Sequence, residues 1–112
     1  SIPVLVGGDS PAAIDRAVRI ADGYFPGEGD IGRLGGLIDR VRRKAEQAKR
    51  DPNSIEINAM FGIQMADPEA GVEQMAELGV GRIMVPAFFF AGPGGLDRLG
   101  EFGERVAPFS RD

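Results

Sequence analysis

Four segments typical of buried strands alternate with four segments typical of amphipathic helices, and this alternation constrains the fold more than any other feature. The expected strands begin near residues 2, 23, 55 and 82, so that each unit takes about 21 to 32 residues. Strictly alternating units of this size predict an α/β fold with a parallel sheet and right-handed crossovers. A complete TIM (β/α)8 barrel takes about 250 residues. Four βα units in 112 residues therefore predict a single partial domain over residues 1–112, a half-barrel.

Apolar patterning and helix caps place the individual elements. The expected strands cover residues 2–6, 24–26, 55–63 and 82–86, and the expected helices begin near residues 11, 31, 68 and 96. The continuous apolar run at residues 2–6 is typical of a strand buried on both faces of a parallel sheet. Ser10 and Asp67 are expected N-caps, each followed by a proline at the first helical position. Gly35 and Gly36 weaken the start of the second helix by about 1 kcal/mol each relative to alanine, so its first turn is expected to fray.

The first expected strand ends at Gly7 and Gly8, and a helix begins at once after Asp9 and Ser10. Glycine lets a backbone come close to a phosphate, and a helix N-terminus supplies free N–H groups and a positive dipole end. This arrangement predicts an anion site at the carboxyl end of the strand. The alternative is a tight strand-to-helix turn with a good cap and no ligand. The sequence contains no Gly-x-Gly-x-x-Gly, which disfavours a Rossmann dinucleotide site.

Composition excludes several kinds of function. The formal net charge is −4 and the charges are interleaved, so a nucleic-acid partner is not expected. The chain has no cysteine and no histidine, which excludes thiolate nucleophiles, a Ser-His-Asp triad and most zinc or iron sites within it. The longest apolar run, residues 83–91, is interrupted by Pro86 and is far below the roughly 20 residues of a membrane span. We expect a soluble, cytoplasmic protein without a metal or a membrane partner.

Several other residues allow a functional and a structural interpretation. Asn58 and Gln64 lie on or just after the third expected strand and either face a site or pack internally. Asp22 is expected to accept hydrogen bonds at a helix end or turn rather than act as an acid catalyst. The aromatic run at residues 88–90 either lines a substrate pocket or packs. The basic run at residues 42–44 is expected to be a solvated face of the long helix.

Three motifs follow one another along the chain. The first is Val4-Leu5-Val6-Gly7-Gly8, followed by Ala17–Ala21 and then by Asp22-Gly23-Tyr24-Phe25-Pro26. The second runs from Ala48 to Ile57 and contains Arg50-Asp51-Pro52, and the third runs from Met75 to Ile83. Together they resemble the bacterial luciferase-like monooxygenase family, which includes the deazaflavin (coenzyme F420)-dependent oxidoreductases. In the first motif Tyr24 stands where that family usually has tryptophan.

The resemblance implies the C-terminal half of that family's barrel. It implies FMN or coenzyme F420 as the cofactor and a small molecule as the substrate, and it places the residues that carry out proton chemistry in the missing half. No catalytic residue is therefore expected here, and the isolated chain is expected to show no oxidoreductase turnover. The cofactor-binding residues that the resemblance implies are the phosphate loop Gly7, Gly8, Asp9 and Ser10, with Asp22, Gly23 and Tyr24 nearby.

A half-barrel also has an alternative use as a non-catalytic assembly module. The chain begins almost on its first strand, which we interpret as a sign that it is part of a larger barrel. Four strands cut from a barrel leave two unpaired edges, which template pairing with another chain. We therefore expect either a homodimer, with contacts through the first and last strands, or pairing with a missing N-terminal half.

Overall fold

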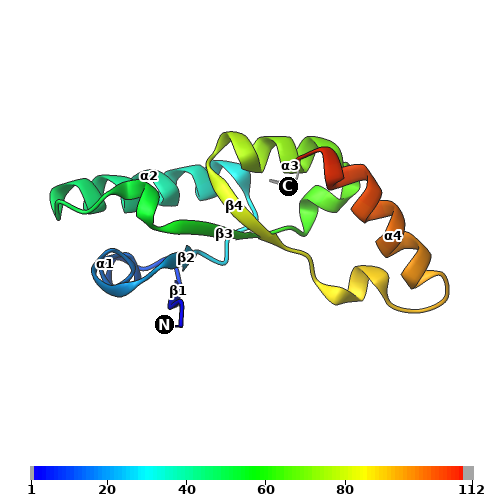
Figure 1. Ribbon diagram of the computed structural model, residues 1–112, viewed down its shortest axis with the longest axis horizontal. Coiled ribbons are helices and arrows are strands. Elements are labelled where there is room, and N and C mark those ends of the chain that lie inside the picture. Colours follow the sequence, from blue (N-terminus) through cyan, green and yellow to red (C-terminus); the bar gives the residue numbers. More distant parts are fainter. Residues whose placement is uncertain (1, 110–112) are drawn as a thin grey trace.

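A computed structural model describes residues 2–109, in which four parallel strands form one sheet in the order β1-β2-β3-β4. The strands are β1 (Leu5–Gly7), β2 (Gly23–Phe25), β3 (Glu56–Met60) and β4 (Val80–Met84). The helices that follow them are α1 (Pro11–Ile20), α2 (Ile31–Gln47), α3 (Pro68–Glu77) and α4 (Gly95–Val106). Figure 1 shows this alternation along the chain. The predicted α/β fold with four parallel βα units is confirmed, and β1 and β4 are the outer strands.

Side-chain caps fix the starts of three helices. The Ser10 hydroxyl accepts a hydrogen bond from the Ala13 N–H at 3.1 Å, and the Asp67 carboxylate accepts one from the Ala70 N–H at 3.4 Å. Both caps were predicted. Asp30 caps α2 in the same way, which the sequence pattern did not indicate. This cap and the burial of Leu34 keep α2 helical through its two glycines, where fraying was expected.

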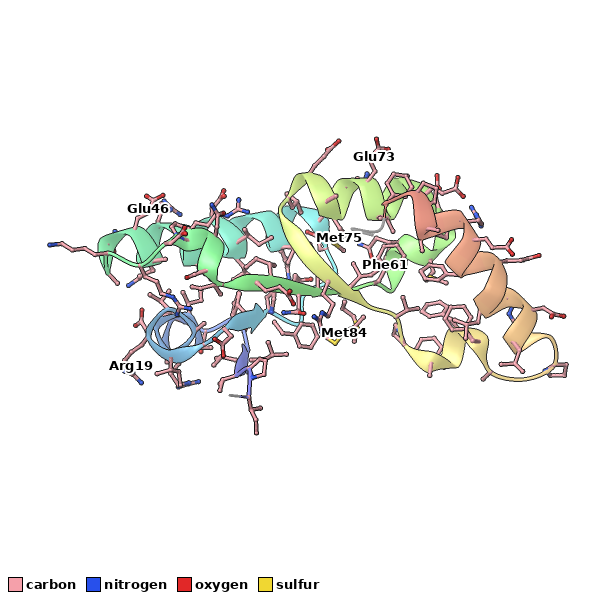
Figure 2. The ribbon with its side chains drawn as sticks, in the orientation of Figure 1. Arg19, Glu46, Phe61, Glu73, Met75 and Met84 are labelled. Atoms are coloured by element: carbon pink, nitrogen blue, oxygen red, sulfur yellow. The ribbon has the colours of Figure 1, made fainter. Side chains whose placement is uncertain are left out.

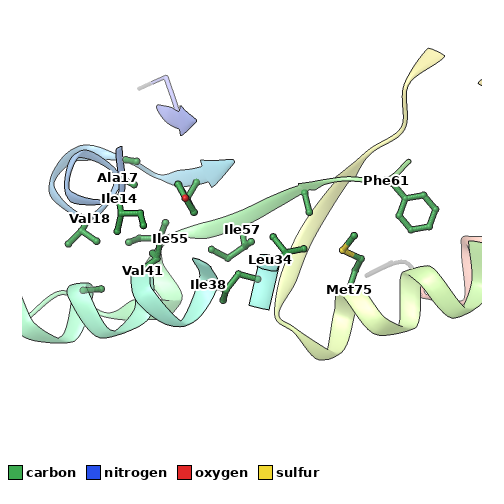
Figure 3. Close-up of a cluster of buried hydrophobic side chains, with 14 residues drawn as sticks. Ile14, Ala17, Val18, Leu34, Ile38, Val41, Ile55, Ile57, Phe61 and Met75 are labelled. Carbon is green, nitrogen blue, oxygen red and sulfur yellow. The ribbon is translucent and has the colours of Figure 1, made fainter. Parts of the chain in front are cut away.

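The hydrophobic core lies between one face of the sheet and helices α1, α2 and α3 (Figure 3). The apolar residues expected on one side of α1 are all buried: Ala13, Ile14, Ala17, Val18 and, just after the helix, Ala21. The stripe of α2 is buried at Leu34, Ile38, Val41 and Ala45, whereas Ala48 is exposed beyond the helix end. From the sheet, Ile57 and Ala59 of β3 enter the same core, as does Tyr24 of β2.

The opposite face of the sheet is covered by no helix of the described chain. Because side chains alternate along a strand, this open face carries Leu5, Gly23, Glu56, Asn58, Arg82 and Met84. The Arg82 Nε lies 3.3 Å from the Glu56 carboxylate, which joins β4 to β3 across this face. In Figure 2, Met84 lies on the side of the sheet away from Met75 of α3.

All four predicted strands differ from the observed ones at their ends. The second covers Gly23–Phe25 rather than residues 24–26, and the third covers Glu56–Met60 rather than residues 55–63. The first covers Leu5–Gly7 rather than residues 2–6, and Leu5 is 54% exposed. The expectation of burial on both faces is wrong, because β1 is an edge strand whose open side has no cover. The fourth strand begins at Val80 rather than residue 82. Gly79, at φ +89°, ends α3 and turns the chain directly into β4.

Helix α4 lies at one end of a molecule that measures 48 × 27 × 24 Å (Figure 1). The apolar side expected for α4 consists of Leu96, Leu99, Phe102 and Val106. Phe102 packs against Phe61 and Phe90 with ring centroids 6.0 and 5.8 Å apart, and Val106 is half-buried. Leu96 and Leu99 of the same stripe are exposed. Within residues 2–109, none of the helices combines the length and apolar character needed to cross a membrane.

Candidate functional site

The connection between β1 and α1 brings the backbone close to neighbouring elements at Gly8. This residue has φ +111°, which L side chains rarely adopt, and a Cβ there would lie 3.1 Å from the Cβ of Ala13. Its N–H donates to the Phe25 carbonyl at 3.1 Å, so the loop continues the pairing of β1 with β2. The positive φ of Gly8 sets the direction in which the chain enters α1. Because glycine has no side chain, the backbone of the loop stays exposed at this point.

Three backbone N–H groups, in this loop and in the first turn of α1, have no hydrogen-bond acceptor within residues 2–109. They belong to Asp9, Ser10 and Ala12, whereas the N–H of Ala13 is satisfied by Ser10. Such groups at the first turn of a helix carry the positive end of its dipole. These N–H groups are the donors that the anion site predicted for this position would use, and that site stays a prediction.

Tyr24 holds the loop from the neighbouring strand. Its hydroxyl donates to the Gly8 carbonyl at 2.6 Å, and its side chain is fully buried. Burial raises the pKa of Tyr24 to about 12, with Asp9 adding to the rise and Arg40 opposing it. The phenol thus stays protonated at physiological pH and remains a donor to the loop.

Asp22 and Gly23 lie away from this loop, at the amino end of β2. The Asp22 carboxylate accepts a hydrogen bond from the Val4 N–H at 2.7 Å, and Gly23 is paired with Leu5. Gly8, in contrast, lies beyond the carboxyl end of β1. A Cβ on Gly23 would lie 2.5 Å from Leu5 Cδ2, so this glycine is required by close packing on the open face. The structure brings Gly7, Gly8, Asp9, Ser10 and Tyr24 together, and it does not bring Asp22 or Gly23 to them.

Arg40 of α2 belongs to this neighbourhood and was not singled out from the sequence. It lines a hollow of about 350 Å³ beside the loop, together with Asp9, Glu28, Arg33, Gly36 and Leu37. The sequence could have indicated Arg40, because it lies one residue before Val41 of the buried side, at the edge of the face that meets α1. The other basic residues of the same helix did not let the pattern distinguish it.

Asn58 and Gln64 are buried, and neither side-chain oxygen has a hydrogen-bond partner within the described chain. Asn58 lies on the open face, beside Gly23. Gln64 follows β3 and donates to the Gly29 carbonyl at 2.8 Å. The aromatic run divides: Phe88 stacks on Phe89 and is 72% exposed, whereas Phe90 packs against α4. Residues 2–109 contain no group of three or more acidic, histidine or cysteine side chains placed to hold a metal.

Comparison with known proteins supplies relatives over most of the chain. An uncharacterized protein of Mycobacterium bovis is 40% identical over 85 residues, and uncharacterized proteins of two Mycobacterium tuberculosis strains match equally well. Each alignment covers 75% of this chain but only 28% of the relative. The chain thus spans less than a third of the length of these relatives.

Two solved structures show a weaker likeness. A riboflavin lyase structure with modified FMN and riboflavin has a TM-score of 0.49 at 18% identity. The DmoA structure from Hyphomicrobium sulfonivorans has a TM-score of 0.45 at 19% identity. Each match covers 62% of this chain and 17% of the other. At these scores neither match carries weight for the fold or for the function.

The sequence pattern of one family extends over nearly the whole chain. The luciferase-like monooxygenase family matches residues 1–105, a span that includes all four strands, the loop at Gly8 and nearly all of α4. The three motifs that resembled this family lie within the match. The chain belongs to the luciferase-like monooxygenase family and forms a partial domain of it.

Proposed function

We propose that this chain forms the C-terminal four βα units of a TIM-barrel oxidoreductase that depends on FMN or coenzyme F420. Its loop of Gly7, Gly8, Asp9 and Ser10 holds the cofactor phosphate. Its remaining strand ends form part of the wall that faces a small-molecule substrate. The bound cofactor supplies the hydride or oxygen chemistry, and the protein supplies binding and orientation.

The observation that carries this proposal is the set of unpartnered N–H groups on Asp9, Ser10 and Ala12. A phosphate placed over them accepts hydrogen bonds from the backbone and meets the positive end of α1. The Ser10 hydroxyl uses its oxygen as the acceptor for Ala13, so its O–H remains available to a phosphate oxygen.

The residues around the loop fit such a group. Gly8 has no side chain to block an anion. The hydrogen bond from Tyr24 holds the Gly8 carbonyl toward the protein, away from an anion. The Asp9 side chain is exposed and lines the hollow that also holds Arg33 and Arg40. Arg33 pairs with Glu28 of the same hollow at 3.9 Å, so Arg40 is the cation that offsets the repulsion between the Asp9 carboxylate and a phosphate.

Asp22 and Gly23 have a supporting part in this proposal. Asp22 ties the backbone of β1 to the start of β2, and Gly23 allows Leu5 to pack between the strands. Both residues keep β1 and β2 in the register that places Gly8 against Phe25 and Tyr24. Their effect on the cofactor is therefore indirect.

A substitution at Gly8 tests the phosphate loop. In the longer protein that contains this chain, we expect Gly8→Val to weaken FMN binding by about tenfold or more, equivalent to about 1.4 kcal/mol. Riboflavin, which lacks the phosphate, serves as the reference ligand and should lose far less affinity. Gly100→Ala is the control variant, because a Cβ there meets nothing within 4 Å. Unchanged FMN affinity in a folded Gly8→Val protein contradicts the proposal.

The exposed sheet edge favours a second candidate function, the non-catalytic assembly module. Leu5 is 54% exposed and Val4 is 45% exposed at the edge formed by β1. A protein that carries neither flavin absorbance nor deazaflavin fluorescence after purification, yet forms a defined oligomer, supports this second function. A yellow or deazaflavin-fluorescent preparation supports the oxidoreductase.

A further inference from the structure

Both backbone groups of Gly8 are held by the neighbouring strand β2. The Gly8 N–H donates to the Phe25 carbonyl at 3.1 Å, and the Gly8 carbonyl accepts from the Tyr24 hydroxyl at 2.6 Å. The first contact continues the backbone pairing of Gly7 with Phe25. The second is made by a side chain, so the pairing of the strands does not account for it.

The contact with Tyr24 determines the direction of the next donor in the loop. The Gly8 carbonyl and the Asp9 N–H belong to one peptide group, which is planar and trans, so that its C=O and N–H bonds point in opposite directions. The carbonyl is held toward the buried phenol. The Asp9 N–H is therefore turned away from the protein, and it has no acceptor within residues 2–109.

Packing alone does not require a hydroxyl at this position. The Tyr24 side chain is fully buried in the core, where a phenylalanine ring would fill nearly the same space. A buried hydroxyl costs free energy unless it forms a hydrogen bond, and the Gly8 carbonyl is the acceptor that the structure provides for it. The hydroxyl thus acts on the loop rather than on the core.

We propose that Tyr24 is a positioning residue, whose hydroxyl acts through the Gly8 carbonyl to direct the Asp9 N–H toward an anion bound at the loop. The inference rests on the proposed function, in which that anion is the phosphate of the cofactor. Without the hydroxyl, the peptide group between Gly8 and Asp9 can rotate. It then presents a carbonyl oxygen to the anion, and the two repel each other.

Ligand binding to the longer protein tests this role. FMN is compared with riboflavin, and coenzyme F420 with the deazaflavin that lacks the phosphate, so the ratio of affinities in each pair reports on the phosphate-bearing part. We expect Tyr24→Phe to weaken the phosphate-bearing ligand by about threefold to tenfold, the range for one hydrogen bond. The phosphate-free ligand should change by less than about twofold.

Two further variants separate this role from a general loosening of the core. Tyr24→para-aminophenylalanine keeps a donor at the end of the ring and should restore the ratio of affinities. Ile38→Val removes a methyl group from the same core, at a position of α2, and should leave the ratio unchanged. Equal losses for both members of a ligand pair in Tyr24→Phe overturn the proposal.

The direction of the Asp9 N–H can be measured without any ligand. In the isotope-labelled protein, the residual dipolar coupling of each amide reports the direction of its N–H bond. We expect Tyr24→Phe to change the coupling of Asp9 and to leave those of Ala17 and Val18, farther along α1, unchanged. An unchanged Asp9 coupling overturns the proposal, whether or not a cofactor binds.

The two measurements distinguish failure of this inference from failure of the proposed function. If the affinity for FMN or coenzyme F420 depends on Gly8 but not on the Tyr24 hydroxyl, the positioning role is wrong and the phosphate loop stands. If removing the phosphate never changes the affinity, in the unaltered protein or in Gly8→Val, the phosphate loop is wrong, and the role of Tyr24 is wrong with it.

Discussion

The Tyr24 hydroxyl donates to the Gly8 carbonyl at 2.6 Å, so that a buried residue of β2 holds the first loop at the end of β1. The two residues are 16 positions apart, and their contact depends on the parallel pairing of Val6 with Tyr24. The phenol is also a group whose protonation can be followed by absorbance.

The ionisation of Tyr24 is the first prediction. Tyr24 is the single tyrosine of the chain, so phenolate absorbance reports on it alone. We expect a midpoint near pH 12 in the folded protein and near the ordinary value of 10.0 in denaturant. A folded-state midpoint at 10 contradicts the buried, hydrogen-bonded phenol.

The same pKa shift predicts how stability depends on pH. Between pH 10 and pH 12 the unfolded state loses the phenolic proton and the folded state retains it, so the free energy of unfolding falls as pH rises. Below pH 10 the contribution is constant. We expect this loss in the unaltered chain and its absence in Tyr24→Phe, measured by denaturant titration at several pH values. A parallel fall in both proteins shows that other groups cause it.

Arg50 gives a prediction about how the end of α1 is stabilised. Its guanidinium donates to the carbonyls of Ala17, Val18 and Ala21 and thereby closes the C-terminal end of α1. We expect Arg50→Gln to lower the free energy of unfolding by about 2–4 kcal/mol, because charge-assisted bonds contribute roughly 1.5–3 kcal/mol each and are not additive. Arg19→Gln, at an exposed position of the same helix, is the matched control. Equal effects of the two substitutions contradict the capping role.

Two glycine substitutions are expected to change stability in opposite directions. A Cβ on Gly71 of α3 would lie 2.6 Å from the Cβ of Gln64 and 2.9 Å from Phe61 Cζ. We expect Gly71→Ala to destabilise the protein by about 1–3 kcal/mol through overpacking. Gly100→Ala in α4 meets nothing within 4 Å and should stabilise it by about 0.5–1 kcal/mol. Thermal denaturation of both variants measures the contrast, and shifts in the same direction contradict it.

Self-association is the last prediction. The uncovered edge of β1 and the open face lead us to expect a homodimer or larger assembly of this chain. Light scattering at micromolar concentration should give at least twice the monomer mass of 11.9 kDa. Leu5→Glu should shift the protein toward monomer, whereas Ile20→Glu, at a similarly exposed position on α1, should not. A monomer whose β1 and β4 amides exchange slowly argues against association through these edges.

Local patterns predicted most of the fold. The Ser10 and Asp67 caps and the apolar side of α1 follow from neighbouring residues, and the outer positions of β1 and β4 follow from the expected half-barrel. The ends of the strands do not follow from local patterns, because apolar runs continue past the point where strand pairing stops. The exposure of Leu5 and Leu96 has the same cause: an apolar pattern shows that a side chain favours burial, but it does not show what covers it.

The candidate site was predictable only in part. Glycine, cap and proline at Gly8, Ser10 and Pro11 indicate a loop with free N–H groups from the sequence alone. The placement of Asp22 at the opposite end of its strand depends on the pairing register of β1 with β2. The position of Arg40 beside the loop depends on how α2 packs against α1, which a helical pattern does not specify.

The one-sided layering of the sheet has a thermodynamic consequence. A compact domain of this length has a radius of gyration of about 13 Å, whereas this chain has 15.1 Å. The larger radius reflects a sheet that is packed on one face, so a ligand or partner that covers the other face would bury surface that is now exposed. By mass action, a ligand or partner that binds only the folded chain raises the free energy of unfolding with the logarithm of its concentration. A rise in the melting temperature of such a chain therefore reports the binding of a ligand or partner.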